Sequence, residues 1–226
     1  MQVISSGGIP LALALGVRGY RLRRPGWVVA AWVVATWQLL LGFTLGLPFA
    51  YLLVRLTTGS DIRQSGSGNV GATNALRANR FAGVLTLLCD AGKGALAVWL
   101  AQRYGGGSWV PVAAGIAAIV GHMFPVFLRF RGGKGVATGC GAFVMLAPRA
   151  VAAAFVLFVL VVALSRFISL GSVVSAAAFP FFVLLFGYGL PVVWGCVLGS
   201  VLIIARHRSN IRRILRGEES RFTLRS

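Results

Sequence analysis

The chain has 226 residues, of which 58% are hydrophobic and 12% charged, and its mean hydropathy is +0.85. A soluble domain carries about a quarter charged residues, so this composition excludes a soluble globular enzyme. It also excludes a disordered chain, which needs low hydrophobicity. At about 20 residues per membrane-spanning helix, the length allows six or seven spans with short loops. The composition predicts one polytopic membrane domain.

The chain is strongly basic, with 22 Lys and Arg against 4 Asp and Glu and a net charge of +18. Such a balance usually suggests nucleic acid. Here the cations share the chain with long apolar runs, so we expect anionic lipid headgroups or phosphate-bearing substrates instead, and no nucleic acid. The three cysteines lie far apart in apolar sequence, which favours neither a disulfide framework nor a zinc site. We expect no metal and no cofactor.

Seven apolar stretches follow one another along the chain. The fourth is short and rich in small residues, which allow helices to approach closely in lipid. The stretches are roughly 27–54, 81–102, 109–127, 135–148, 150–165, 169–187 and 190–205.

The distribution of Lys and Arg predicts the orientation of these spans. With seven spans, the loops near 55–80, 128–134 and 166–168 share one side of the membrane with the C-terminal tail. That side carries 15 Lys and Arg, the opposite side carries 6, and Lys93 falls inside a span. The more basic side should be cytoplasmic, which places the C-terminus inside and the N-terminus outside, although four arginines near the N-terminus go against the rule.

The first basic loop carries glycines at alternating positions over 66–71, before the second span. Glycines expose backbone N–H groups and allow a ligand to approach closely, and N–H groups at the start of a helix can face an anion. Arg77 adds a planar donor suited to phosphate. The simpler alternative is a connecting loop rich in Gly and Asn. The short hydrogen-bonding side chains of the loop are Ser67, Asn69, Thr73 and Asn74.

The second glycine-rich turn opens the fourth stretch and contains Lys134. It is not a Walker P-loop, because that motif needs four residues between its first Gly and its Gly-Lys pair, followed by Ser or Thr, after a strand. ATP is therefore disfavoured, whereas a phosphate cradle is not. The alternative is a flexible basic loop. The candidate substrate-binding residues of this turn are Gly132, Gly133, Lys134, Gly135 and Thr138.

The tail and the spans add isolated polar residues. If the last helix continues beyond the membrane, His207 and Asn210 share one face of it, whereas the tail arginines are mainly expected to contact acidic lipids. Asp90 and Lys93 lie three residues apart within a span, where ionisable residues are costly and usually paired or functional; we favour a structural ion pair. His122 and Ser172 fall near the cytoplasmic ends of their spans.

At these residues the sequence resembles the acyl-phosphate-dependent glycerol-3-phosphate acyltransferases of bacteria, the PlsY family. Three motifs match in order over roughly 42–222: the Gly-Ser-Gly-Asn loop with Arg77, the Gly-Gly-Lys-Gly-Val-Ala-Thr turn, and the His207/Asn210 tail with Glu219. The resemblance makes 1–25 an extension of no assigned role and 26–226 a single integral-membrane acyltransferase domain with a short basic tail.

The resemblance implies transfer of a fatty acyl group from acyl phosphate to the 1-hydroxyl of glycerol 3-phosphate, giving lysophosphatidic acid and phosphate. This would be a first step of phospholipid synthesis, performed by a monomer in the cell membrane with its active site on the cytoplasmic face. The Gly132–Gly135 turn matches the glycerol-3-phosphate-binding motif of the family. The positions matching its phosphate and catalytic pocket are Ser67, Arg77, Lys134, Ser172, His207 and Asn210.

Three questions stay open at this stage. His207 could act as a general base near neutral pH or as a positioning donor, with acyl-phosphate oxygens taking the hydroxyl proton; the scarcity of acids favours the second role. A transporter of a phosphorylated or lipid anion is the main alternative function, since Asp90 and Lys93 would suit one. A non-enzymatic anchor that binds acidic lipids through its tail would leave the glycine-rich loops unexplained.

Overall fold

The computed structural model describes residues 47–222, which form helices and connecting loops with no β-strand among them. The expected all-α class is confirmed for this part of the chain, whereas the extension 1–25 and most of the first apolar stretch lie outside it. The helices are α3 (Phe49–Thr58), α4 (Ala72–Ala78), α5 (Arg80–Tyr104), α6 (Trp109–Met123), α7 (Val136–Val144), α8 (Pro148–Ser165), α9 (Ile168–Leu185), α10 (Leu190–Arg206) and α11 (Arg208–Leu215), with short 3₁₀ turns at Ile62–Gln64 and Val126–Leu128.

The lengths of these helices differ from the simple expectation of seven full spans. Within the described residues, α5, α8, α9 and the segment Trp109–Leu128 are long and apolar enough to cross a membrane. The bent pair α10 and α11 makes a fifth candidate, whereas α3 and α7 are shorter apolar helices. At 1.5 Å per residue, the nine residues of α7 cover about 14 Å, roughly half of a bilayer core. Length alone therefore supports four or five spans.

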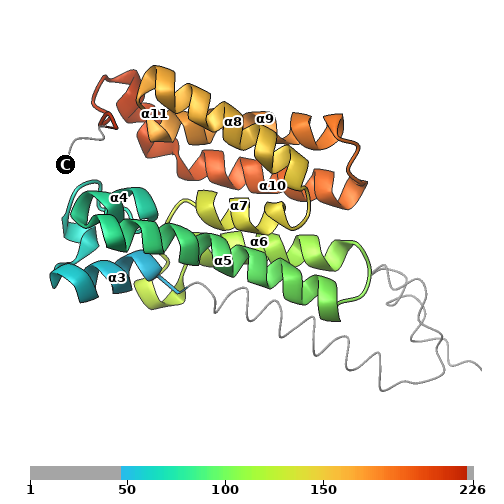
Figure 1. The fold of residues 1–226 in the computed structure, drawn as a ribbon. Coiled ribbons are helices and arrows are strands. Elements are labelled where there is room, and N and C mark those ends of the chain that lie inside the picture. The colour runs from blue at the N-terminus through green and yellow to red at the C-terminus, as the bar shows by residue number, and fades with distance from the viewer. Residues whose placement is uncertain (1–46, 223–226) are drawn as a thin grey trace, which may run out of the picture.

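The helices form two layers, with α3 to α7 in one and α8 to α11 in the other (Figure 1). Inside the first layer, α5 and α7 pack with their backbones in contact, because a methyl group on Gly94 would overlap the carbonyl oxygen of Thr138 and one on Gly141 that of Ala91. The small residues of the fourth apolar stretch thus serve the close packing that the sequence predicts.

A hydrophobic core joins the two layers. Its buried side chains come from α6 to α10, and Phe143 of α7 meets Phe179 of α9 edge to face, with ring centroids 5.2 Å apart. A second core holds α3, α4 and the start of α5 together at the end of the molecule that also carries α11 (Figure 1). This shared end brings the first glycine-rich loop close to the C-terminal segment.

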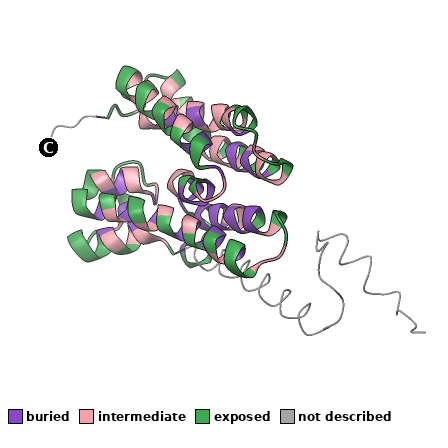
Figure 2. Cartoon of the chain, turned by 45° about the vertical axis from the view of Figure 1, so that its right-hand side comes forward, coloured by how far each residue is buried: buried purple, intermediate pink, exposed green. Residues whose placement is uncertain are grey.

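Buried residues face the interior of the molecule and exposed residues face its outside (Figure 2), and many of the exposed side chains are large and hydrophobic. Leu164 on α8 and Leu56 on α3 are each more than 80% exposed. Leaving a Leu side chain in water costs about 1.5–3 kcal/mol relative to burial, and many such residues line these helices. A lipid environment removes that cost, which agrees with the hydropathy of the chain.

The last helix does not continue straight beyond residue 206. The chain bends by 53° between α10 and α11, and His207 stands at the break. The bend turns α11 back toward α9, so that Asn210 becomes buried instead of lying on the surface of a projecting helix.

Candidate functional site

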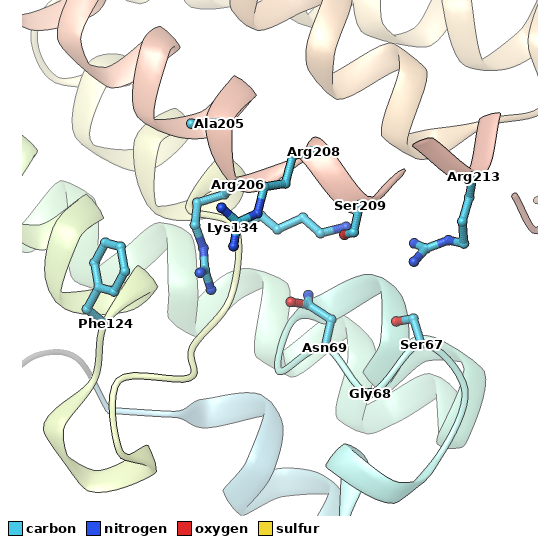
Figure 3. Close-up of a pocket in the computed structure, with 10 residues that line it drawn as sticks. All are labelled: Ser67, Gly68, Asn69, Phe124, Lys134, Ala205, Arg206, Arg208, Ser209 and Arg213. Atoms are coloured by element: carbon cyan, nitrogen blue, oxygen red, sulfur yellow. The ribbon is translucent and has the colours of Figure 1, made fainter. Parts of the chain in front are cut away.

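A cleft of about 500 Å³ opens between the two layers. The first loop forms one wall, and the second glycine turn with the break between α10 and α11 forms the other (Figure 3). Four cations and no carboxylate line it. The lining residues are Ser67, Gly68, Asn69, Phe124, Lys134, Ala205, Arg206, Arg208, Ser209 and Arg213.

The first loop is held in shape by the buried amide of Asn74. Its Oδ1 accepts a hydrogen bond from the Ser67 N–H at 3.1 Å, and its Nδ2 donates to the carbonyl oxygens of Ile62 and Ser65 at 3.2 and 3.0 Å. Gly66 has φ +57°, and a side chain there would overlap Oδ1 of Asn74. Asn74 therefore organises the loop that presents Ser67 and Asn69, and it does not itself line the cleft.

The second turn is fixed from α10. The guanidinium of Arg206 donates to the carbonyl oxygens of Gly132 at 3.0 Å and Gly133 at 3.2 Å. It also lies over the ring of Phe124, 5.2 Å from the centroid. Gly135 then caps the start of α7 with φ +81°, a left-handed conformation that favours glycine. These contacts aim Lys134 into the cleft (Figure 3).

The cleft alters the protonation of its lysine. Burial lowers the pKa of Lys134 to about 8; the carboxylate of Glu219 opposes this effect, and the charges of Arg213, Arg77 and Arg206 add to it. The neighbouring arginines repel the ammonium group of Lys134, and a bound anion would offset this repulsion.

His207 is buried beside the cleft and is neutral at physiological pH. Burial and the nearby charge of Lys134 lower its pKa to about 4. Its Nδ1 lies 2.8 Å from the carbonyl oxygen of Ile203, which can only accept, so Nδ1 carries the proton. Nε2 is then a hydrogen-bond acceptor. The ring cannot donate from Nε2 in this form.

Glu219 fixes the C-terminal segment. Its carboxylate accepts from Ser169 Oγ at 2.7 Å, Asn210 Nδ2 at 2.6 Å and Arg213 Nε at 2.7 Å. These bonds tie α11 to the start of α9 and set the direction of Arg213. The Oδ1 of Asn210 is buried and has no hydrogen-bond partner among the described residues.

The structure gathers the expected site residues at one end of the molecule, but only some of them reach the cleft. Ser67, Asn69 and Lys134 line it. Arg77 is exposed at the end of α4, outside the lining, although its charge still acts on Lys134. The buried hydroxyl of Ser172 donates to the carbonyl oxygen of Ile168 within its own helix. Thr138 is buried in α7, and its hydroxyl has no partner in the described part of the chain.

Sequence reasoning missed the arginines of the tail as lining residues. Arg206, Arg208 and Arg213 line the cleft together with Ser209, whereas the sequence analysis assigned these cations mainly to lipid contact. The available signal was their position immediately around His207 and Asn210. It was not decisive, because a basic tail after a last span is common for reasons of topology alone.

The fold and the cleft define a class: a helical membrane protein with a cation-lined, carboxylate-free cavity at one end of its helices. A family model described as glycerol-3-phosphate acyltransferase matches residues 25–217. The chain is 46% identical to the glycerol-3-phosphate acyltransferase of Rubrobacter xylanophilus, over 83% of this chain and 94% of that protein. It is 47% identical to that of Synechococcus sp. strain CC9902, over 81% and 92%.

Two solved structures share the fold. The crystal structure of PlsY, an integral membrane glycerol 3-phosphate acyltransferase, in its glycerol 3-phosphate form superposes with a TM-score of 0.79 at 37% identity, covering 84% of this chain and 96% of that one. Its lysophosphatidic acid form gives 0.76 at 35%, covering 84% and 95%. The chain belongs to the glycerol-3-phosphate acyltransferase (PlsY) family, as the three sequence motifs indicate.

Proposed function

We propose that this protein transfers a fatty acyl group from acyl phosphate to the 1-hydroxyl of glycerol 3-phosphate, releasing lysophosphatidic acid and inorganic phosphate. The observation that carries the proposal is the cleft, in which four cations and no carboxylate line about 500 Å³. Two phosphate groups bring up to four negative charges, which these cations would balance. Membership of the family and the solved glycerol 3-phosphate form of PlsY support the choice of acceptor.

The reaction needs little beyond positioning. In acyl phosphate the bond between the acyl carbon and the phosphate oxygen breaks as the glycerol oxygen bonds to that carbon, so phosphate leaves with its electron pair. Lys134, Arg206 and the Ser67 hydroxyl hold and orient the two anions. They also stabilise the oxyanion that develops on the acyl oxygen. Asn69 also lines the cleft. The other expected residues lie outside the lining and act on the substrates through the shape and charge of the site: Asn74, Gly132, Gly133, Gly135, Thr138, Ser172, Arg77 and Asn210.

The hydroxyl proton passes to an oxygen of the acyl phosphate. A base with a pKa of about 4 is a poor proton acceptor at neutral pH, so the lowered pKa of His207 weakens the general-base role. Its Nε2 can still accept a hydrogen bond and orient the glycerol hydroxyl toward the acyl carbon. In this proposal, His207 positions by accepting, and the donor role expected from sequence is set aside.

We place the enzyme in the cell membrane as a monomer with seven spans, its N-terminus outside and the cleft on the cytoplasmic face. The bias of 15 Lys and Arg against 6 supports this orientation. The start of the family match at residue 25 supports 26–226 as the acyltransferase domain and 1–25 as an extension.

A comparison of acyl donors tests the proposal. Purified protein in lipid or mild detergent receives glycerol 3-phosphate with either palmitoyl phosphate or palmitoyl-CoA, while phosphate and lysophosphatidic acid are measured. We expect product with the acyl phosphate alone, and in Lys134→Ala a KM for glycerol 3-phosphate that is about tenfold to a hundredfold higher. Arg149→Ala, which changes an exposed cation at the start of α8, should retain the wild-type rate. No product from either donor with folded protein would overturn the proposal, and glycerol 3-phosphate flux into liposomes would then favour a transporter.

A further inference from the structure

Three ionisable side chains form a buried cluster beneath the second glycine turn. Lys93 Nζ lies 2.7 Å from Asp90 Oδ1 and 2.8 Å from His122 Nδ1, and His122 Nδ1 lies 3.4 Å from the same carboxylate oxygen. All three residues are at most 9% exposed. None of them lines the cleft, so the proposed chemistry does not use them.

The hydrogen bonds within the cluster define which way the imidazole faces. A charged lysine can only donate, so Nζ donates to Asp90 and to the Nδ1 of His122. The imidazole proton then lies on Nε2, at the far side of the ring. Lys93 and Asp90 form an ion pair. The pairing offsets the cost of placing each charge within a membrane span.

The far side of the His122 ring lies against the glycine turn. A methyl group on Gly133 would overlap Nε2 of His122, and it would come within 2.8 Å of the carbonyl oxygen of Val70 in the first loop. The backbone N–H of Gly133 also donates to the carbonyl oxygen of His122 at 3.2 Å. His122 therefore touches the turn through both its ring and its backbone, at the point where the two substrate loops meet.

The turn is thus held from both sides. Arg206 binds the carbonyl oxygens of Gly132 and Gly133 from the cleft side, and the cluster supports the same two residues from the core side. The cavity beside Asp90, His122 and Gly133 has a volume of about 10 Å³, which is barely enough for one water molecule. The turn therefore has little space to move toward the core. Because Lys134 follows Gly133 directly, its position depends on this support.

We propose that Asp90, Lys93 and His122 are positioning residues. They hold the Gly132–Gly133 turn at a fixed distance from the helix core, and they thereby place Lys134 opposite the first loop. The inference rests on the proposed function for its kinetic consequence alone. A misplacement of about 1 Å at a distance from the reacting atoms can cost about a hundredfold in rate.

Two substitutions of His122 separate positioning from mere stability. His122→Asn places an amide oxygen where Nδ1 accepts from Lys93 but removes the ring beneath Gly133, and His122→Ala removes both. We expect KM for glycerol 3-phosphate to rise at least tenfold in both variants, while the melting temperature falls clearly only in His122→Ala. A rise in KM that is absent from the folded Asn variant would overturn the inference.

A double substitution tests the contact directly. Gly133→Ala should raise KM for glycerol 3-phosphate, because its methyl group collides with the His122 ring. In the His122→Ala background the same substitution should cost at least threefold less, since the ring is gone. Gly135→Ala is the matched control: its methyl group would meet Met123 Cε at 2.6 Å and its φ is +81°, so its cost should not depend on residue 122. Equal costs of Gly133→Ala in both backgrounds would contradict the proposal.

A chemical readout distinguishes failure of this inference from failure of the acyltransferase assignment. The chain has two lysines, and Lys93 is buried, so acetic anhydride should modify Lys134, as mass spectrometry can locate. We expect glycerol 3-phosphate or inorganic phosphate to protect Lys134 in the wild type and at least fivefold less in His122→Asn. If ligand protects Lys134 in this way but no product forms, the acyltransferase assignment fails and the positioning role stands. Undiminished protection in the variant would reject the positioning role, whatever the turnover.

Discussion

At the scale of single residues, Lys134 is the group whose surroundings most change its chemistry. Its pKa of about 8 follows from burial and from neighbouring arginines, so the ammonium loses its proton as pH rises through that value. A phosphate monoester loses its second proton near pH 6. The cationic lysine and the dianionic substrate therefore coexist mainly between about pH 6 and 8.

We predict that KM for glycerol 3-phosphate rises as pH increases from 7.5 to 9.5, because a neutral amine cannot pair with phosphate. Lys134→Arg should remove this rise, since guanidinium stays charged throughout the range. Lys134→Ala should raise KM by about tenfold to a hundredfold at pH 7.5, the usual worth of a charged hydrogen bond. Steady-state kinetics from pH 6 to 9.5 measures all three. An unchanged alkaline rise in the Arg variant would assign it to another group.

The size of the loss in kcat when His207 is removed distinguishes its two possible roles. Loss of one neutral hydrogen bond costs up to about tenfold in rate, whereas loss of a general base costs about 10²–10⁴-fold. We expect His207→Ala to lower kcat by about tenfold. The ratio of wild-type to variant kcat should also stay constant from pH 6 to 8, because the pKa of about 4 lies well below that range. A ratio that rises through pH 6.5 would restore the base, and an unchanged kcat would remove both roles.

At this scale the sequence shows which polar residues matter but not what each one does. Ser67, Asn69 and Lys134 reach the cleft as expected. The side chain of Asn74, from the same loop as Ser67 and Asn69, instead forms hydrogen bonds with the backbone of that loop. Ser172 bonds within its own helix. Spacing cannot separate a residue that contacts a ligand from one that shapes the loop, because both need a short hydrogen-bonding side chain near glycine.

At the scale of elements, the decisive feature is the break between α10 and α11. The sequence places His207 and Asn210 on one helical face if the last helix continues, whereas the chain turns by 53° at His207 and both side chains are buried. Glu219 makes that turn possible by binding Ser169, Asn210 and Arg213 together. The sequence could not reveal this, since the contact between Ser169 and Glu219 joins residues 50 positions apart.

We predict that the Glu219 clamp stabilises the fold and fails in acid. Burial alone would raise the pKa of Glu219, but hydrogen bonds from Ser169, Asn210 and Arg213 outweigh it and hold the pKa below 4.5. A carboxyl group with a lowered folded-state pKa stabilises the protein fully above its unfolded pKa, and this contribution is lost as pH falls through the folded value.

Glu219→Gln should therefore lower stability by about 1–3 kcal/mol at pH 7, and its deficit should shrink as the pH falls below 4.5. Melting temperatures in detergent measure both effects. Glu218→Gln is the matched control, because Glu218 is exposed and next in sequence; it should melt like the wild type. A deficit for Glu219→Gln that stays unchanged as the wild-type carboxyl group is protonated in acid would show that the charge of Glu219 does not contribute to these contacts.

At the scale of the whole molecule, two layers of helices pack together (Figure 1). The cation-lined cleft lies between them. Hydropathy and the positive-inside bias predict the class and the order of apolar segments, because burial in lipid and charge at loops act on composition alone. They do not predict helix length: α7 is a nine-residue helix packed backbone to backbone against α5. A short helix inside the protein core needs no full apolar span, so apolar segments of similar hydropathy form helices of different lengths.

Thiol labelling can test the orientation of the chain in the membrane. If the cleft is cytoplasmic, the exposed residues Ser60 and Ser220 lie inside, and Ser108 between α5 and α6 lies outside. In a background without Cys89, Cys140 and Cys196, we expect Ser108→Cys to react with a membrane-impermeant thiol reagent on intact cells. Ser60→Cys and Ser220→Cys should react only after permeabilisation. The opposite pattern would invert the chain and expose the cleft outside, where cytoplasmic glycerol 3-phosphate could not reach it. A mixed pattern, with Ser60 and Ser220 on different sides, would mean that the number of spans between them is odd instead of even.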